Sequence, residues 1–449
     1  MTDKHGLMSQ EVFESTWERV RYEVTKFPFS DLRSSADYLI KYARKKYSAN
    51  PQLITHFMQW QSAPLPLNTS ANCTAASCVG PDLRISMVGD MMWMRKGWRS
   101  FLSTEVLAFL EGRDIVLGNL ETPVSPSHKV IECMPDLFSF NSPSAMLDHL
   151  AECFTAVSIV NNHSLDQGIA ALCETMQELD KRGLLHAGAY APDHDREYVM
   201  IHKGRWRIAF LAYAWGLNHI SPQEINSPVR LNVMDLSDPL KPTDYSIMEK
   251  HIDSAKKDRA DLILWSLHWG HEFEMYPTFH MMQIARELIS KGVDVIMGHH
   301  PHVLHPFEIV DVNAERPFGF DNIQDSTRPE ARKVVIAYSL GNFVSAMYTR
   351  ECLQSCIFNI NYISREDRLI LDGVSYLPTF CLKTYRGALM RQVVSIPDAL
   401  KKDHPLGRER DLIASLRDIT KHLGEAFLYH DGNAHTGNDG SEPYSFLSL

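Results

Sequence analysis

The sequence lacks the features that mark several large classes of protein. Its eight cysteines form no CxxC pair, which argues against a zinc site built from thiolates. No apolar run approaches the ~18 residues that a membrane-spanning helix needs. Residues 1–20 are charged and polar, without the apolar stretch of a secretory signal, so we expect a cytoplasmic protein.

Basic residues are also in short supply. The chain has 45 Lys and Arg against 55 Asp and Glu, a formal net charge of −10. Nucleic-acid binding needs a basic face that displaces counterions, so we expect no nucleic-acid partner. A mildly acidic protein still accepts an anionic substrate, either a small molecule or a polymer, because a bound metal can dominate the local field. The composition leaves the oligomeric state open.

The overall amino-acid composition is that of a folded protein. Of the 449 residues, 44% are hydrophobic and 22% are charged, a mixture typical of soluble globular chains. This length fits either about three domains or one large α/β domain with extensions.

The patterning divides the chain into four parts. Residues 1–62 repeat apolar side chains at helical spacing and predict a helical N-terminal extension, and residues 63–80 are small and polar, as in a linker. Residues 81–400 alternate short apolar runs with helical patterns, which predicts an α/β domain. Residues 401–449 predict a helical segment followed by a disordered tail.

Within this domain the expected strands are short apolar runs, at 85–88, 115–117, 154–160, 208–213, 262–267, 293–297 and 334–338. Helical spacing lies between them, at 100–111, 143–152, 168–182, 243–258 and 278–291. Residues 356–363 and 369–377 alternate in polarity and predict an antiparallel pair. Ligands of α/β sheets bind beyond the carboxyl ends of strands, so the residues that follow each run are the candidates for chemistry.

Polar side chains follow most of the expected strands. Loops at one edge of a sheet converge, and these loops offer carboxylates, amides and imidazoles. This inventory suits a hydrolytic centre of one or two divalent ions, with Mn, Fe or Zn favoured over Mg because imidazoles do not suit Mg. The residues are Asp90, Glu121, Asn162, His163, His268, His300 and His302.

Taken singly, most of these residues have plainer explanations. Asp90 could be a turn or capping residue, Glu121 a surface carboxylate and His268 a half-buried imidazole. His300 and His302 flank a proline directly after a strand, for which packing offers no reason. In extended backbone both would point to one side and His299 to the other, so we expect His299 to support a ligand rather than to be one.

Six motifs resemble, in order, those of CapA-type proteins of poly-γ-glutamate capsule synthesis, a branch of the calcineurin-like metallophosphoesterases. The resemblance implies a four-layer sandwich of two mixed β-sheets flanked by helices, with the metal centre at one edge, and here with the helical N-terminal extension. The motifs are MVGD (87–90), GNLETP (118–123), NNHSLDQG (161–168), SLHWG (266–270), GHHPHV (298–303) and YSLGNF (338–343).

The resemblance also implies roles for particular residues. His163 occupies the position of a catalytic histidine, and Asp166 would orient its imidazole. The implied metal ligands are Asp90, Glu121, Asn162, His268, His300 and His302.

The chain departs from the wider superfamily in three places. Met92 stands where an Asp-x-His motif beginning at Asp90 would have its histidine, and Asn119 stands where a bridging aspartate is usual. Glu121 is the residue available to compensate. Many members of the family have a membrane anchor where this chain has residues 1–62.

Three functions are consistent with these residues. The leading hypothesis is a metal-dependent phosphoesterase in which His163 donates a proton to the leaving oxygen. The altered motifs instead favour a non-catalytic subunit of a polymer synthesis or export complex. Hydrolysis of a γ-glutamyl amide is the third, since activated water also attacks carbonyl carbon. All six motifs follow residue 80, so we also expect residues 1–80 to be dispensable for the metal site.

Overall fold

A computed structural model describes residues 32–44, 51–62, 81–94, 96–131, 139–218, 220, 225–236, 242–313, 323–326, 328, 330–385, 389–402 and 409–429. The helical pattern predicted before residue 32, the predicted linker at 63–80 and the predicted tail after residue 429 lie outside the described residues.

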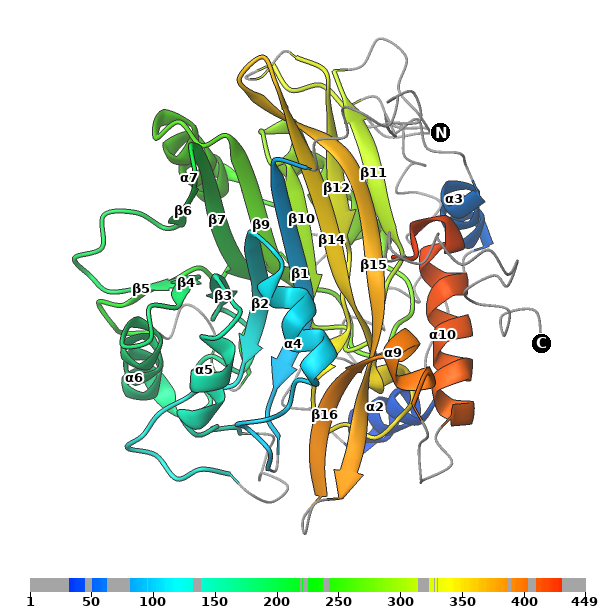
Figure 1. The fold of residues 1–449 in the computed structure, drawn as a ribbon. Helices are drawn as coiled ribbons and strands as arrows, with labels where there is room; N and C mark the ends of the chain where they lie inside the picture. The colour runs from blue at the N-terminus through cyan, green and yellow to red at the C-terminus, as the bar shows by residue number, and fades with distance from the viewer. Residues whose placement is uncertain are drawn as a thin grey trace.

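The larger of two main sheets has eight strands. They are β1 (Leu83–Met92), β2 (Ile115–Glu121), β3 (Ala156–Ser158), β4 (Leu185–Ala187), β13 (Asn342–Val344), β14 (Gln354–Arg365), β15 (Arg368–Tyr385) and β16 (Leu389–Ser395). Their order is β16–β15–β14–β1–β2–β3–β4, and β13 pairs with β1 (Figure 1). Strands β1 to β4 run parallel, whereas β14 and β15 form the antiparallel pair that the alternating pattern predicted.

The second sheet has six strands, β6 (Val199–Lys203), β7 (Trp206–Ala214), β9 (Leu262–His268), β10 (Val295–His299), β11 (Phe307–Val312) and β12 (Arg332–Ala337). Their order is β11–β12–β10–β9–β7–β6, with the four central strands parallel and the two edge strands antiparallel. A small sheet pairs β5 (Ala189–Tyr190) with β8 (Arg230–Leu231).

The helices cover the outer faces of the sheets. They are α2 (Leu32–Ala43), α3 (Pro51–Ser62), α4 (Thr104–Glu111), α5 (Ala145–Leu150), α6 (Gly168–Asp180), α7 (Ser246–Lys257), α8 (Phe279–Ser290), α9 (Ile396–Leu400), α10 (Glu409–Leu423) and the short 3₁₀ helices η4 (Glu351–Leu353) and η5 (Glu425–Phe427). Capping fixes some of the starts: the backbone N–H of Met281 donates to Thr278 at the head of α8, at 3.2 Å. Among the described helices, none is long and apolar enough to cross a membrane.

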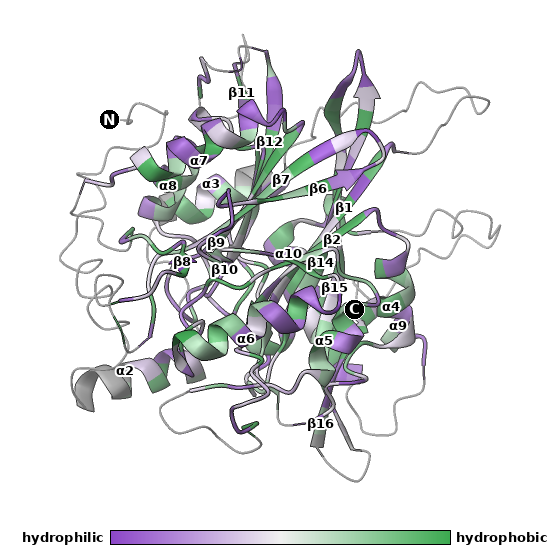
Figure 2. Ribbon diagram, turned by 90° about the vertical axis from the view of Figure 1, so that its left-hand side faces the viewer, coloured by the Kyte–Doolittle hydropathy of each residue, from purple (hydrophilic) through white to green (hydrophobic). Residues whose placement is uncertain are grey.

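Alternate residues of the second sheet serve two different cores. Ile208, Phe210 and Leu264 face the larger sheet and pack in the core between the sheets. Their neighbours Leu211 and Trp265 pack on the opposite face, against residues of α3, α7 and α8, and these helices lie on one side of the second sheet (Figure 2). Strands buried on both faces explain the continuous apolar runs of the sequence. Two mixed sheets flanked by helices confirm the predicted sandwich.

Helices before and after the predicted 81–400 domain pack onto it. Phe57 of α3 is buried in the second core, and His56 Nε2 lies 2.5 Å from Glu308 Oε1 of β11. Leu412 and Leu416 of α10 enter the larger core, and α10 lies beside α3 (Figure 1). The boundaries at residues 62, 80 and 400 stay predictions, but the flanking helices share the cores of the sheets.

A bulge in β1 sets the position of Asp90. The pairing of β1 with β2 shifts register between Met87 and Asp90, and the backbone N–H of Asp90 donates to Gly341 O at 2.8 Å. A Cβ atom at Gly89 would lie 2.0 Å from that same oxygen, so the two backbones approach this closely only because residue 89 is glycine. The bulge therefore holds Asp90 against the 341 turn at the end of the strand.

We expect Gly89→Ala to lower the free energy of unfolding by about 1–3 kcal/mol, because the new methyl group meets fixed backbone rather than a movable side chain. Urea unfolding followed by circular dichroism measures the change. Gly373→Ala is the matched control, since no atom lies within 4 Å of a Cβ built there. Equal stability of the two variants would contradict the account of this bulge.

Candidate metal centre

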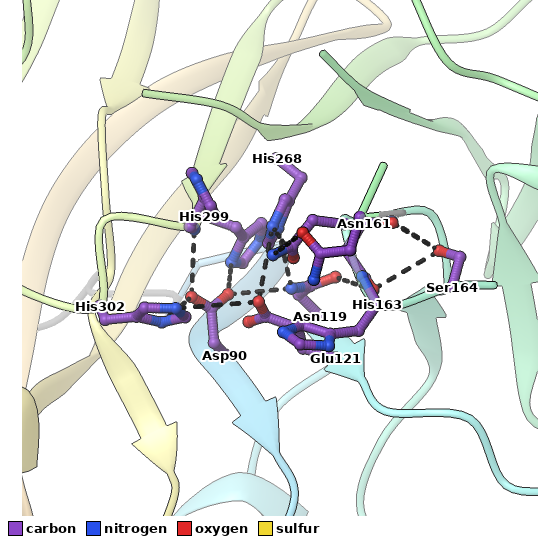
Figure 3. Close-up of polar contacts among 12 residues, drawn as sticks. Asp90, Asn119, Glu121, Asn161, His163, Ser164, His268, His299 and His302 are labelled. Atoms are coloured by element: carbon purple, nitrogen blue, oxygen red, sulfur yellow. Dashed lines mark hydrogen bonds and ion pairs between the residues drawn. The ribbon is translucent and has the colours of Figure 1, made fainter. Parts of the chain in front are cut away.

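The parallel strands of both sheets end at the same edge, and the predicted site residues meet there (Figure 3). Asp90 and Glu121 lie at the ends of β1 and β2, His268 ends β9, and His300 and His302 follow β10. All are buried except His300, which is half-buried. The edge therefore collects two carboxylates and two imidazoles away from bulk water, with the His300 imidazole partly exposed.

The Asp90 carboxylate joins the two sheets. Its Oδ1 lies 2.9 Å from His299 Nδ1 and accepts a hydrogen bond from Asn119 Nδ2 at 2.9 Å. Its Oδ2 accepts the backbone N–H of His300 at 3.1 Å and lies 3.5 Å from His302 Nδ1. Burial alone would raise the pKa of Asp90, but the imidazoles of His299 and His302 outweigh it and hold the pKa well below its usual range.

The Glu121 carboxylate has no hydrogen bonds that compensate for its burial. Both of its carboxylate oxygens are buried and have no hydrogen-bond partner. Oε1 lies 3.5 Å from His268 Nε2 and 3.9 Å from His302 Nε2. Burial, and then the charge of Asp90, raise the pKa of Glu121 well above its usual range. A buried carboxylate without hydrogen bonds is costly, so this position calls for a cation.

Asn162 and His268 approach each other across the two sheets. Asn162 Oδ1 lies 2.9 Å from His268 Nε2, and Asn162 Nδ2 donates to Asn218 Oδ1 at 3.3 Å. The other ring nitrogen of His268, Nδ1, lies 3.4 Å from Asn119 Nδ2. Burial, followed by the nearby imidazole of His300, lowers the pKa of His268 well below its usual range. A neutral imidazole is the form that binds a metal.

His300 and His302 are brought together by a turn and not by a strand. The expectation of extended backbone is wrong here, since β10 ends at His299 and φ is 95° at His300 and 57° at His302. The turn around Pro301 places the two ring centroids 5.8 Å apart. Left-handed backbone at two residues other than glycine costs on the order of 1–3 kcal/mol each, a strain that is concentrated at functional sites.

The pKa values of the two imidazoles are shifted in opposite directions. Burial lowers the pKa of His300 to about 4, so its ring is neutral near pH 7. For His302 burial also lowers the pKa, but the hydrogen bond to Asp90 outweighs it and the pKa is raised. His302 Nδ1 also lies 3.0 Å from Asn342 Oδ1. The His300 imidazole is therefore ready to bind a cation, whereas His302 holds a proton more tightly than a free imidazole does.

His163 is held by contacts on two sides. Its Nδ1 lies 2.7 Å from Asp166 Oδ2, and its ring stacks on Phe140 with centroids 4.1 Å apart. Asp166 Oδ2 also accepts the backbone N–H of Phe140 at 2.7 Å, which ties the carboxylate and the ring together. Trp93 also stacks on Phe140, with ring centroids 5.9 Å apart. The imidazole points toward Glu121 (Figure 3).

The donor atoms fit a divalent metal. Two donors that share one ion at about 2.0–2.2 Å lie roughly 3–3.5 Å apart, which is close to the 2.9 and 3.5 Å measured from His268 Nε2 to Asn162 and Glu121. Oxygen and imidazole donors together suit Mn, Fe or Zn. Three groups have donor atoms within 4.8 Å of one another: Asp90, Glu121 and His302; Glu121, His268 and His300; Glu272, His300 and His302.

Sequence reasoning missed Glu272 and the amides that support the ligands. Glu272 lies in the loop after β9, shortly after His268, and its place in a strand-end loop was the available signal. Asn342, in the last of the six motifs, contacts His302. Asn161 Nδ2 donates to the backbone oxygen of Leu120 at 2.9 Å and so ties the loop after β3 to β2.

Comparison with known proteins gives one family. A sequence model described as "Bacterial capsule synthesis protein PGA_cap" matches residues 84–347. The "PGA biosynthesis protein CapA" of Bacillus subtilis is 27% identical over 271 residues, 58% of this chain and 63% of that protein. The "Capsule biosynthesis protein CapA" of Bacillus anthracis is 26% identical over 277 residues, 58% of this chain and 59% of that protein. The chain thus spans about three fifths of the length of these relatives.

Solved structures resemble the chain only loosely. The calcineurin-like phosphoesterase YfkN of Bacillus subtilis gives a TM-score of 0.38 at 12% identity, covering 75% of this chain and 96% of that one. A 5'-nucleotidase precursor of Thermus thermophilus gives 0.37 at 12% identity, covering 75% and 59%. Likenesses at this level are too weak to support a statement about the reaction.

The match to the family model, in contrast, is extensive enough to assign the family. It covers more than half of the chain, and its range contains every strand end and loop that contributes to the centre described above. The chain belongs to the bacterial capsule synthesis (PGA_cap) family, as its CapA-type motifs predicted.

Proposed function

We propose that the chain is a metal-dependent hydrolase that acts on phosphoesters of an anionic small molecule or polymer. The observation that carries the proposal is the Glu121 carboxylate, which is buried, has no hydrogen-bond partner and lies within reach of imidazoles. One or two ions of Mn, Fe or Zn fit this donor set better than Mg. The proposed ligands are Asp90, Glu121, Asn162, His268, His300 and His302.

When bound, a divalent ion supplies positive charge that lowers the pKa of water and offsets the negative charge of a phosphoryl group. His163 is the proposed proton donor to the leaving oxygen. Because its Nδ1 is paired with Asp166 at 2.7 Å, its Nε2 is the nitrogen left to exchange a proton with a substrate. The stacked Phe140 ring fixes the plane of the imidazole. Phosphoryl transfer depends mainly on such positioning and electrostatics.

Two rival functions keep the same centre. A non-catalytic role in polymer synthesis or export is favoured by Asn119, whose amide donates to Asp90 where a second carboxylate would bridge two ions. Hydrolysis of γ-glutamyl amides is the second rival, because a metal-activated water also attacks carbonyl carbon. A panel of phosphoesters and γ-glutamyl peptides, assayed with Mn²⁺ or Zn²⁺, separates the three: phosphate release supports the proposal, amine release supports the amidase, and no turnover supports the subunit.

We expect His163→Asn to reduce hydrolysis by about 10²–10⁴-fold, because the proton donor is lost, while the metal content of the purified protein stays unchanged. His202→Asn is the matched control, since His202 is exposed on β6. Turnover and elemental analysis on the same preparations measure both quantities. Loss of metal in the first variant would make His163 a ligand, and unchanged turnover would give the loop a structural role only.

We expect His300→Ala and His302→Ala each to lower metal per chain, after dialysis, more than His299→Ala or His271→Ala does. His299 contacts Asp90 and supports it, and His271 packs near Trp215 with ring centroids 5.6 Å apart. Circular dichroism checks that each variant is folded. If His299→Ala removes the metal and His300→Ala does not, the ligand assignment in this turn is wrong.

We expect metal binding to release protons and to strengthen as pH rises. The raised pKa values of Glu121 and His302 mean that the metal-free chain keeps protons on both groups above their usual pH range, and a metal must displace them. Calorimetric titration with Zn²⁺ between pH 6 and 8, in buffers of different ionisation enthalpy, counts the protons. Glu121→Gln should release fewer. Binding without proton release at every pH would refute this account.

A further inference from the structure

The loop after β9 brings a third carboxylate to the edge of the centre. Glu272 lies in this loop, and one of its oxygens is within 4.8 Å of donor nitrogens of His300 and His302. Glu272 Oε2 is buried and has no hydrogen-bond partner. This carboxylate therefore resembles Glu121 in having a buried oxygen that no hydrogen bond compensates.

Helix α2 makes contact with Glu272 from the outside. The hydroxyl of Tyr38 donates a hydrogen bond to the Glu272 carboxylate. The Tyr38 ring meets the neighbouring Phe273 edge-on, with centroids 5.2 Å apart. The Phe273 ring in turn lies 6.1 Å from the imidazole of His302. Tyr38 thus reaches the centre through a hydrogen bond to one residue and a ring contact to the next.

Two further contacts fasten α2 in this place. Lys41 Nζ lies 2.9 Å from Glu274 Oε1, and both side chains are at most 7% exposed. Tyr42 packs edge-on against Phe273 at 5.2 Å, and its hydroxyl oxygen accepts the backbone N–H of Tyr348 at 2.8 Å. Separating the two partners would leave an uncompensated buried charge, which is strongly unfavourable. The ion pair therefore holds α2 and the loop after β9 together.

The sum of charges at the centre also needs explaining. Asp90, Glu121 and Glu272 place three carboxylates around the imidazoles of His268, His300 and His302. Buried charges of one sign must be offset by nearby charges of the other. Divalent ions would offset three carboxylates, and a carboxylate at residue 272 supplies an anionic ligand that Met92 and Asn119 do not.

We propose that Glu272 binds a metal ion together with His300 and His302, and that Tyr38 of α2 is the positioning residue that holds Glu272 there. This inference rests on the proposed function, because it requires that the centre binds metal. The hydroxyl of Tyr38 fixes one carboxylate oxygen and leaves the other for the ion. The N-terminal helix is then part of the centre, in contrast to the sequence-based expectation that residues 1–80 are dispensable for it.

The test compares four versions of the 449-residue chain, each stripped with a chelator: the unchanged chain, Glu272→Gln, Tyr38→Phe and Tyr42→Phe. Mn²⁺ titration followed by the electron paramagnetic resonance of free Mn²⁺ gives stoichiometry and affinity without any activity assay. We expect two ions in the unchanged chain and one in Glu272→Gln. Tyr38→Phe should keep both and bind the weaker about 10–100-fold less tightly, as is typical when the partner of a ligand is removed.

Tyr42→Phe is the matched control, because it also removes one tyrosine hydroxyl from α2 and Tyr42 also packs against the Phe273 ring. It tests for loosening of α2 alone, and its Mn²⁺ affinity should fall less than that of Tyr38→Phe. Equal affinities of Tyr38→Phe and Tyr42→Phe, or full binding by Glu272→Gln, would overturn the inference and leave the proposed function standing. If the unchanged chain binds one ion, weaker Mn²⁺ binding by Glu272→Gln and Tyr38→Phe than by Tyr42→Phe supports the inference. The opposite order of affinities overturns it. No Mn²⁺ binding at all would overturn both.

Discussion

Buried negative charge at the ends of β1 and β2 is the constraint on which the rest of the structure depends. Asp90 and Glu121 are fully buried, in surroundings where a lone carboxylate is strongly disfavoured. Imidazoles offset the first, whereas the oxygens of the second have no hydrogen-bond partner. The bulge that needs Gly89 and the turn that carries His300 both bring the chain to this edge, and the left-handed backbone of the turn has a conformational cost. We infer that a bound cation is what compensates the arrangement.

Much of the fold follows from local patterns in the sequence. The apolar runs at 85–88 and 262–267 predict strands correctly because both faces of those strands are buried, and parallel strands bring their ends to one edge. Strand β11 escaped notice because two acidic residues, Glu308 and Asp311, interrupt its apolar pattern. Glu308 is buried in an ion pair with Arg286 at 2.7 Å, a partner that no local pattern reveals.

The site was harder to predict where it depends on backbone turns and distant segments. Which residues follow each strand can be read from the sequence, but φ values of 95° and 57° at His300 and His302 depend on the packing around Pro301. Glu272 reaches the centre in a loop with a left-handed Phe273, at φ 64°, that α2 covers. Such contacts join residues far apart in the chain, so neither spacing nor composition indicates them.

The account as a whole depends on a metal bound between the two sheets. X-ray diffraction from crystals grown with Mn²⁺, recorded at an energy where manganese scatters anomalously, locates such an ion directly. We predict an anomalous peak within ligand distance of the Glu121 carboxylate and of at least one of His268, His300 and His302. Crystals saturated with Mn²⁺ that show no peak at this edge, and hydrogen bonds from water or protein to both Glu121 oxygens instead, would contradict the account.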